Sequence, residues 1–460
     1  MTSYGRPMTS VLPGTARQLL AHTAGLQREG RLPSLVAGVV RDGGLAWWAG
    51  RGTVEGREPD DDVQYRIGSI TKTITAVAAM RLRDEGLLGL DDPVDRHLPG
   101  TPYGDRTVGQ LLAHGAGLSA ESPTVWWERA PGADWADFTQ QLTPGDLKHP
   151  AGRRFHYSNL GYGVLGELVA RLRGRPWADV VRDEVLLPLG MTRTTPRPDG
   201  DAAQGYAVHP WADLLLPEPE HDAGAMAPAG QLWATLADLG RFGAFLLGDT
   251  GGVLAEDTLT EMTQPAGVDA ASPGWSAYGL GLQVVRVDGR TLVGHGGSMP
   301  GFLAGVFVDR KEATGAVLLT NATSGLAPNA VPTLLDILRA AEPRAVDAWQ
   351  PLPEVDDEAL ELTGTWYWGT TAYGLRLRGD GVLDLLGLQG AGRASRFRRE
   401  GRTWVGLDGY HAGETLRPVR EQGRLVALDL GSFVFSRAPY DPAAPIPGGV
   451  DEKGWRAGPA

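Results

Sequence analysis

Strand-like segments stand at both ends of a long, otherwise helical region, and this arrangement constrains the fold more than any other feature. Two apolar segments, 34–40 and 45–50, flank a glycine-containing turn and predict a β-hairpin. Further strand-like segments follow far along the chain, at residues 278–287, 291–294, 302–309 and 314–320. The residues between are mainly helical and rich in loops. We therefore predict an α+β fold: one antiparallel sheet made from both ends and flanked by helices, with a helical subdomain inserted over about 90–260 and a cleft where the two meet.

A second region of different composition begins after Pro343. Residues 346–357 form a predicted linker, and short strand-like segments then recur at regular spacing: 362–367, 374–378, 381–386, 395–399, 403–407, 414–419, 424–429 and 432–436. Such spacing predicts a small antiparallel β-barrel or sandwich. We expect domains at 1–345 and 358–440, followed by a disordered tail at 441–460, which is rich in Pro, Gly and Ala.

The bulk composition excludes several classes of partner and site. With a net charge of −12, we expect neither nucleic acid nor a membrane as a partner. The lack of cysteine excludes disulfides, thiolate metal sites and a cysteine nucleophile. The histidines show no metal-ligand spacing, so we expect no metal and no other cofactor. The N-terminus does not resemble a signal peptide, and no apolar run approaches ~18 residues, so we predict a cytoplasmic protein. The sequence does not indicate the oligomeric state.

The most informative short motif is Ser69 followed by Lys72 at the start of a predicted helix. Residues three apart share a helix face, so the hydroxyl and the amine can meet. The helix N-terminus also brings unpaired backbone N–H groups to the serine. This combination suits a nucleophile, its proton acceptor and part of an oxyanion site. The alternative is a helix-capping serine followed by a solvated lysine.

Lysine usage argues against that alternative. The chain has 43 basic residues, of which only four are lysine: Lys72, Lys148, Lys311 and Lys453. Arginine therefore supplies almost all surface positive charge, and a lysine persists most readily where arginine cannot replace it. A position whose side chain must lose its proton is one where arginine cannot serve, because guanidinium stays protonated. Burial can instead lower the pKa of a lysine ammonium from its ordinary value of ~10.4. Among the lysines, only Lys72 follows a serine by three residues.

Two further segments supply candidate partners. Tyr157 stands two residues before Asn159, and a phenol close to an ammonium can be held as phenolate and act as a base. The alternative is a tyrosine that merely anchors a helix start. His295 begins the run His-Gly-Gly-Ser after a strand, where glycines allow backbone to approach a ligand closely. His411-Ala412-Gly413 also matches this pattern, but we choose His295 because its strand belongs to the main sheet.

These three motifs, in this order, resemble the class C β-lactamase-related serine hydrolases, the group shared with penicillin-binding proteins, DD-peptidases, esterases and D-aminopeptidases. The resemblance covers roughly residues 15–340 and includes the stretches 111–118, 229–242 and 278–281. It implies a β-lactamase/transpeptidase-like fold. The region 346–440 resembles the lipocalin-like barrel that is appended to some members.

The resemblance also implies roles for individual residues. Ser69 would be the nucleophile, with Lys72 and Tyr157 handling protons and Asn159 orienting the substrate and Lys72. His295 would stand where lactamase members carry the Lys of K-T-G. The remaining positions are backbone groups: the oxyanion hole would be the N–H of Ser69 and that of Ser298, which follows Gly297.

A histidine in place of that lysine shifts the expected chemistry, since imidazole is mostly neutral near pH 7 and suits a substrate carboxylate less well. We therefore predict a serine hydrolase acting on a small-molecule or peptide substrate, either an ester or an amide, of the esterase or D-amino-acid-directed peptidase type, with weak or no β-lactamase activity. One alternative is a stand-alone thioesterase or acyltransferase that offloads or macrocyclises peptides. An alternative of a different class is a β-lactam-binding protein that is acylated without turnover.

Overall fold

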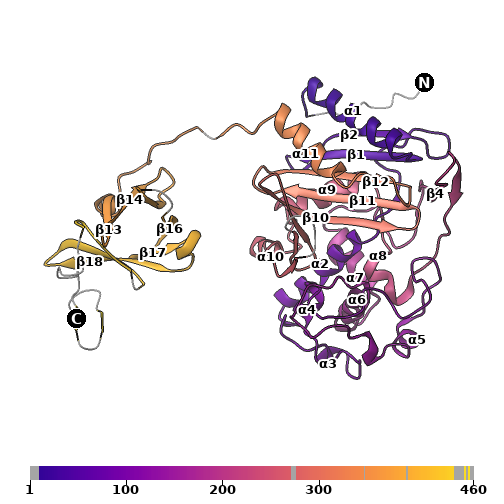
Figure 1. The fold of residues 1–460 in the computed structure, drawn as a ribbon, viewed down its shortest axis with the longest axis horizontal. Helices are drawn as coiled ribbons and strands as arrows, with labels where there is room; N and C mark the ends of the chain where they lie inside the picture. The colour runs from indigo at the N-terminus through magenta and orange to yellow at the C-terminus, as the bar shows by residue number, and fades with distance from the viewer. Residues whose placement is uncertain are drawn as a thin grey trace. The chain divides into compact units, whose positions relative to one another are not determined.

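The computed structural model describes residues 10–270, 276–346, 348–389, 392–431, 433–439, 450–451 and 454–455. It divides the chain into two compact units, Met1–Arg344 and Ala345–Ala460. Figure 1 shows the first unit as a sheet with helices packed on it and the second as a smaller, mainly β structure. Within the described residues, no helix is both long enough and apolar enough to cross a membrane.

The first unit is organised by an antiparallel sheet that has eight strands among the described residues, in the order β2-β1-β12-β11-β10-β9-β8-β7 (Figure 1). Their bounds are β1 (Ser34–Arg41), β2 (Gly44–Gly52), β7 (Gly267–Asp269), β8 (Ser276–Tyr278), β9 (Gln283–Val287), β10 (Arg290–Met299), β11 (Phe302–Asp309) and β12 (Thr314–Thr320). The β1–β12 pairing, with Leu35 opposite Thr320, joins the two ends of the region. This confirms the predicted α+β architecture.

Two local features explain how the strands turn. Asp42 and Gly43 have φ of 54° and 84°, the left-handed values that a tight hairpin turn between β1 and β2 requires. The predicted single strand over 278–287 is wrong, because the chain reverses between β8 and β9. Gly281, in that reversal, has φ of 87°, and a Cβ there would lie 2.1 Å from the Cβ of Ala76. Only glycine allows the turn to press this closely against its neighbouring helix.

Helices cover both faces of the sheet. On one face, α1 (Pro13–Glu29) and α11 (Ala330–Ala341) share a core with Leu35, Ala37 and Val39 of β1 (Figure 1). On the other face, α2 (Ile70–Asp84) and α9 (Leu236–Leu247) share a core with Val36 and Val40. Successive residues of a strand point to opposite faces, so β1 contributes to both cores and is buried on both sides.

The inserted region folds mainly into helices. They are α3 (Val94–His97), α4 (Val108–Leu112), α5 (Trp135–Thr139), α6 (Asn159–Arg173), α7 (Trp177–Val181), α8 (Ala227–Gly230) and α10 (Glu256–Met262). Ser158 caps α6 by accepting a hydrogen bond from the N–H of Gly161. A Cβ at Gly166 would lie 2.0 Å from Cγ of Pro228, so α6 and α8 pack closely. The residues of α2 are buried almost without exception, as expected of a helix with neighbours on every side.

The second unit is a closed antiparallel barrel, with eight strands in the part of this unit that the structure describes. They are β13 (Gly364–Trp368), β14 (Thr371–Leu377), β15 (Leu383–Gly387), β16 (Ser395–Glu400), β17 (Thr403–Gly406), β18 (Thr415–Glu421), β19 (Arg424–Leu430) and β20 (Phe433–Ser436). This confirms the predicted barrel. Its interior is filled by large side chains such as Trp366, Phe397 and Trp404.

The start of the barrel differs from the sequence prediction. A helix, α12 (Asp357–Leu362), precedes β13 where the first strand was expected to begin. The Asp356 side chain accepts a hydrogen bond from the N–H of Ala359 and so caps this helix. The predicted tail at 441–460 falls outside the described residues, apart from β21 (Val450–Asp451) and β22 (Gly454–Trp455).

Candidate active site

Ser69 is held at the N-terminus of α2 by a sharp turn that begins at Gly68. Gly68 has φ of 50°, and a Cβ at this position would lie 2.5 Å from the backbone N of Ser298. The approach requires glycine, because any side chain would collide with β10. The turn therefore places the serine hydroxyl and the backbone of Ser298 side by side.

Lys72 lies one helical turn inside α2 and is completely buried. Its Nζ is 2.9 Å from Oγ of Ser69 and donates a second hydrogen bond, of 2.6 Å, to the carbonyl of Ala229. Burial lowers the pKa of Lys72 to about 7, and the nearby carboxylates of Glu121 and Glu128 oppose that shift. A substantial share of neutral amine is thus present near pH 7, directly on the serine hydroxyl.

Tyr157 completes the contact around the nucleophile. Its hydroxyl is hydrogen-bonded to Ser69, and Nζ of Lys72 lies 5.1 Å from the centre of its ring. Burial raises the pKa of Tyr157 well above its ordinary value, although the bond to Ser69 lowers it in part. The phenolate that the sequence suggested is therefore disfavoured in the free protein, and the phenol keeps its proton at neutral pH.

The role expected of Asn159 is only partly visible. Its side-chain amide nitrogen donates to both carboxylate oxygens of Glu121, at 2.9 Å each. Trp127 donates to the same carboxylate through Nε1 at 2.7 Å. Asn159 thus holds a carboxylate that raises the pKa of Lys72, whereas the amine itself is hydrogen-bonded to Ser69 and Ala229. Sequence reasoning missed Glu121.

His114 is a second residue that sequence reasoning did not single out. Its ring packs on that of Tyr157 with centres 4.2 Å apart, and its Nδ1 accepts a hydrogen bond of 3.0 Å from the N–H of Ser158. Burial holds the pKa of His114 well below its usual range, so the imidazole is neutral. The available signal was its place in the family-like stretch 111–118.

The β10 side of the site presents backbone rather than charge. β9 begins at Gln283, opposite Gly294, so no described strand pairs with that side of β10 from His295 onward. The Gln283 side chain accepts a hydrogen bond of 3.2 Å from the N–H of Gly296 there. A Cβ at Gly297 would lie 1.9 Å from the carbonyl oxygen of Ile67, which shows that the strand is pressed against the turn before Ser69. N–H groups alternate between the two edges of a strand, so the N–H of Ser298 is on the same edge as that of Gly296, whereas the N–H of Gly297 faces β11. Ser298 therefore offers the donor that an oxyanion needs.

His295 itself is turned into the protein. Its Nε2 is 2.9 Å from the hydroxyl of Tyr278, and its Nδ1 contacts the carbonyl oxygen of Gly296. Because a carbonyl only accepts, Nδ1 carries the proton and Nε2 accepts from Tyr278. Burial lowers the pKa of His295 to about 3, so the ring is uncharged. The other match to the motif, His411, is buried in the barrel unit, with Nδ1 3.0 Å from Oγ of Ser395.

A cavity of about 680 Å³ opens at the nucleophile. Its lining includes Ser69, Tyr157, His295, Gly297 and Ser298, and it continues along β9 and β11 toward the start of α11. The nucleophile, the phenol and the backbone of the open strand edge thus face one space. This arrangement can bind a carbonyl compound, attack it from Ser69 and stabilise the negative charge that develops.

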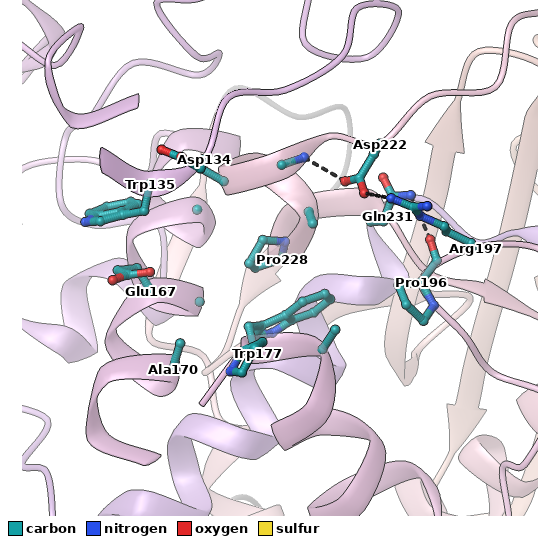
Figure 2. A pocket seen from close by; sticks show the side chains of 17 residues that line it. Asp134, Trp135, Glu167, Ala170, Trp177, Pro196, Arg197, Asp222, Pro228 and Gln231 are labelled. Atoms are coloured by element: carbon teal, nitrogen blue, oxygen red, sulfur yellow. Dashed lines mark hydrogen bonds and ion pairs between the residues drawn. The ribbon is translucent and has the colours of Figure 1, made fainter. Parts of the chain in front are cut away.

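A second cavity, of about 410 Å³, lies behind α8 and is lined by other residues, among them Trp135, Trp177 and Pro228. Figure 2 shows the two indole rings and Pro228 around this space, with Arg197 paired to Asp222 at one side. The walls of this second cavity connect to the helix that carries Lys72. Trp177 donates a hydrogen bond to Oγ1 of Thr75 on α2, and Thr75 donates one to the carbonyl of Pro228 on α8.

Comparison with protein families agrees with this geometry. A family model described as Beta-lactamase matches residues 19–341, and one described as Domain of unknown function (DUF7586) matches residues 355–437.

Individual relatives are 28–29% identical to the chain over the residues that match. Penicillin-binding protein 4 of Amycolatopsis lactamdurans is 29% identical over 321 residues, which cover 64% of this chain and 82% of that protein. Beta-lactamase-like protein 2 of Dictyostelium discoideum is 28% identical over 278 residues, 56% of this chain. The match spans only 50% of the length of the Dictyostelium protein.

Solved structures show the same fold. The octameric penicillin-binding protein homologue from Pyrococcus abyssi superposes with a TM-score of 0.65 at 22% identity, over 91% of this chain and 99% of that chain. A D-stereospecific amidohydrolase from Streptomyces sp. superposes with a TM-score of 0.60 at 24% identity, over 72% of this chain and 99% of that chain.

Proposed function

Because the chain belongs to the beta-lactamase family, we propose that it is a serine hydrolase that acts through an acyl-enzyme on Ser69. The observation that carries the proposal is the 2.9 Å contact between Oγ of Ser69 and Nζ of Lys72, an amine whose pKa burial lowers to about 7. An amine with a pKa near the working pH is well suited to take the serine proton.

The proposed acylation step uses the groups around Ser69 in turn. Neutral Lys72 accepts the proton of the serine hydroxyl as Oγ attacks the substrate carbonyl. The backbone N–H groups of Ser69 and Ser298 bind the resulting oxyanion. Tyr157, which is hydrogen-bonded to Ser69 and keeps its proton at neutral pH, donates to the leaving group and is recharged from Lys72. Water then attacks the acyl carbonyl and gives a proton to Lys72. That proton passes to Oγ of Ser69 as the bond between Oγ and the acyl carbon breaks, so the free acid leaves and the serine hydroxyl is restored.

The proposed substrate is a small ester or amide, including amides of D-amino acids. Support comes from the neutral state of His295, which offers no positive charge to a substrate carboxylate, so efficient β-lactam hydrolysis is not expected. Further support comes from the solved D-stereospecific amidohydrolase that shares the fold.

The test begins with labelling by a serine-reactive fluorophosphonate. We expect the wild-type protein to be labelled and Ser69→Ala to be unlabelled, with Ser298→Ala as the matched control that keeps its label, since Ser298 acts through its backbone. Labelling that survives in Ser69→Ala would refute the nucleophile assignment.

A substrate panel then distinguishes the reactions. p-Nitrophenyl esters, D- and L-amino-acid amides, nitrocefin and peptidyl thioesters are compared, with Ser69→Ala as the blank. Free acid as product supports hydrolysis, whereas cyclic or transferred product supports acyl transfer. Intact-mass spectrometry with a β-lactam covers the third possibility: an adduct that never clears, together with no turnover of any substrate, would replace the hydrolase by a β-lactam-binding protein.

A further inference from the structure

The outer face of β10, toward α11, lacks side chains next to the nucleophile. In the β10–β11 register, Gly296 is opposite Gly305 and Ser298 is opposite Leu303. Directly opposed residues of antiparallel strands point to the same face, so a pair of glycines and a serine occupy this part of the sheet. The result is a shallow floor between the neighbouring strands.

Apolar side chains on the two strands that flank β10 line the same cavity. Val285 and Val287 stand on β9, and Leu303 and Phe307 stand on β11, all partly exposed and lining the cavity that contains Ser69. Leu326, in the segment before α11, lines the same cavity. We call the space bounded by these five side chains and floored by the glycine pair the β10 trough.

The floor is open at Gly296 and closed at Gly305. A Cβ at Gly296 would have no atom nearer than 4.0 Å, whereas a Cβ at Gly305 would lie 2.8 Å from Cγ2 of Val331 on α11. α11 therefore covers the β11 side of this floor and leaves the β10 side, at Gly296, accessible. Space at Gly296 is room for a ligand and not for packing within the protein.

The trough is continuous with the nucleophile. No described strand pairs with β10 beyond Gly294 on the β9 side, where the Gln283 side chain bonds to the N–H of Gly296. One cavity extends from the trough residues to Ser69 and Tyr157. Among the described residues of the cavity lining, Arg286 is the one Asp, Glu, Lys or Arg, and His295 is neutral. An occupant that enters from Ser69 thus meets mainly hydrocarbon.

On these grounds we propose that the β10 trough binds an extended, uncharged alkyl arm of the substrate whose carbonyl Ser69 attacks. The inference rests on the proposed hydrolase function and adds its substrate class: medium-chain acyl or alkyl derivatives in preference to short ones. The arm is either the acyl chain or the leaving group, since both are joined to the same carbonyl. Its burial against the five side chains supplies the binding energy.

Two ester series test the proposal and identify which part of the substrate occupies the trough. In one, p-nitrophenyl esters carry acyl chains of two to eight carbons; in the other, acetate is esterified with alcohols of the same lengths. A buried methylene contributes about 0.8 kcal/mol, which is about fourfold in kcat/KM. We expect kcat/KM to rise roughly 200-fold from four to eight carbons in one of the series.

Filling the trough should remove this preference. Gly296→Val places a side chain in the open floor, and the expected result is that the octanoate-to-acetate ratio of kcat/KM falls toward one. Gly44→Val is the matched control, because Gly44 lies at the start of β2 in the same sheet and a Cβ there would meet nothing within 4 Å. Val287→Asp is a second disrupting variant, should Gly296→Val fold poorly.

Equilibrium binding gives a readout that does not need catalysis. Titration of 2-decanone into Ser69→Ala should show binding that weakens at least tenfold when Gly296→Val is added. A flat chain-length series in a protein whose hydrolysis depends on Ser69, or 2-decanone binding indifferent to Gly296→Val, would overturn the trough while leaving the hydrolase intact. Hydrolysis or labelling that persists in Ser69→Ala would instead overturn the proposed function, and the 2-decanone titration would still decide on the trough.

Discussion

Two nitrogen bases of the same site, Lys72 on α2 and His295 on β10, are equally buried but differ in what burial does to them. Burial lowers the pKa of Lys72 from 10.5 to about 7 and that of His295 from 6.5 to about 3. The two shifts are similar in size. The pKa of Lys72 moves close to neutral pH, where the amine can exchange a proton, whereas the pKa of His295 moves far below neutral pH. The ordinary pKa of a residue thus decides whether burial turns it into a proton acceptor at neutral pH or keeps it permanently uncharged.

The largest expected effect is on the α2 side. Lys72→Arg should lower kcat/KM by about 10³-fold, nearly as much as Lys72→Ala, because guanidinium cannot release its proton. Lys148→Arg is the matched control: Lys148 is exposed and donates to the carbonyl of Gly145, which arginine can also do. Steady-state kinetics on the best ester would check this, and an active Lys72→Arg enzyme would contradict the role of a neutral amine.

The pH dependence should come from the same residue. Lys72 is the base in its neutral form, which is lost as the pH falls through its pKa of about 7. We expect kcat/KM to fall about tenfold per pH unit below ~7 and to level off above it. His295 is already neutral over that range, with a pKa of about 3. A profile that is flat between about pH 5 and 8 would remove Lys72 as the titrating base.

Glu121 should shift that profile without abolishing activity. Its carboxylate raises the pKa of Lys72, so Glu121→Gln should lower that pKa and move the acid limb to lower pH. Because Glu121 is largely exposed, we expect a shift of about 0.5 unit. Glu85→Gln, which removes a carboxylate that pairs with Arg173 elsewhere, is the control and should leave the limb in place. Movement of the acid limb to higher pH would show that Glu121 lowers the pKa of Lys72 and does not raise it.

The smallest expected effect is on the β10 side. His295→Gln keeps a side chain able to bond with Tyr278 and carries no charge, like the neutral imidazole. We expect kcat/KM to change by less than about tenfold and the acid limb to stay where it is. If this variant were as damaged as Lys72→Arg, His295 would be a catalytic base and the contrast between the two sides would disappear.

Much of the fold follows from local patterns in the sequence. The hairpin of β1 and β2, the strands β11 and β12 and the regular strands of the barrel all have apolar runs bounded by turn residues. The interruption between β8 and β9 was missed because Gly279–Leu282 is as apolar as a strand. Its reversal depends on the contact of Gly281 with Ala76, which is distant in sequence.

The residues of the candidate site also divide into those that the local sequence identified and those that it did not. Ser69 and Lys72 were identifiable because their contact is local to one helix and because lysine is so rare in this chain. Glu121 and His114 were not, because each reaches the site through partners from another segment, Asn159 and Tyr157 respectively.

The sequence by itself therefore determined which side chains could carry the chemistry and in which kind of fold they would stand. Tertiary structure decided their protonation states. The phenolate expected at Tyr157 is disfavoured, the amine of Lys72 is close to half-neutral near pH 7, and His295 is uncharged. The physical reason is that a pKa depends on the water and charge that surround a group, and only the packing of α2, α6 and β10 sets these.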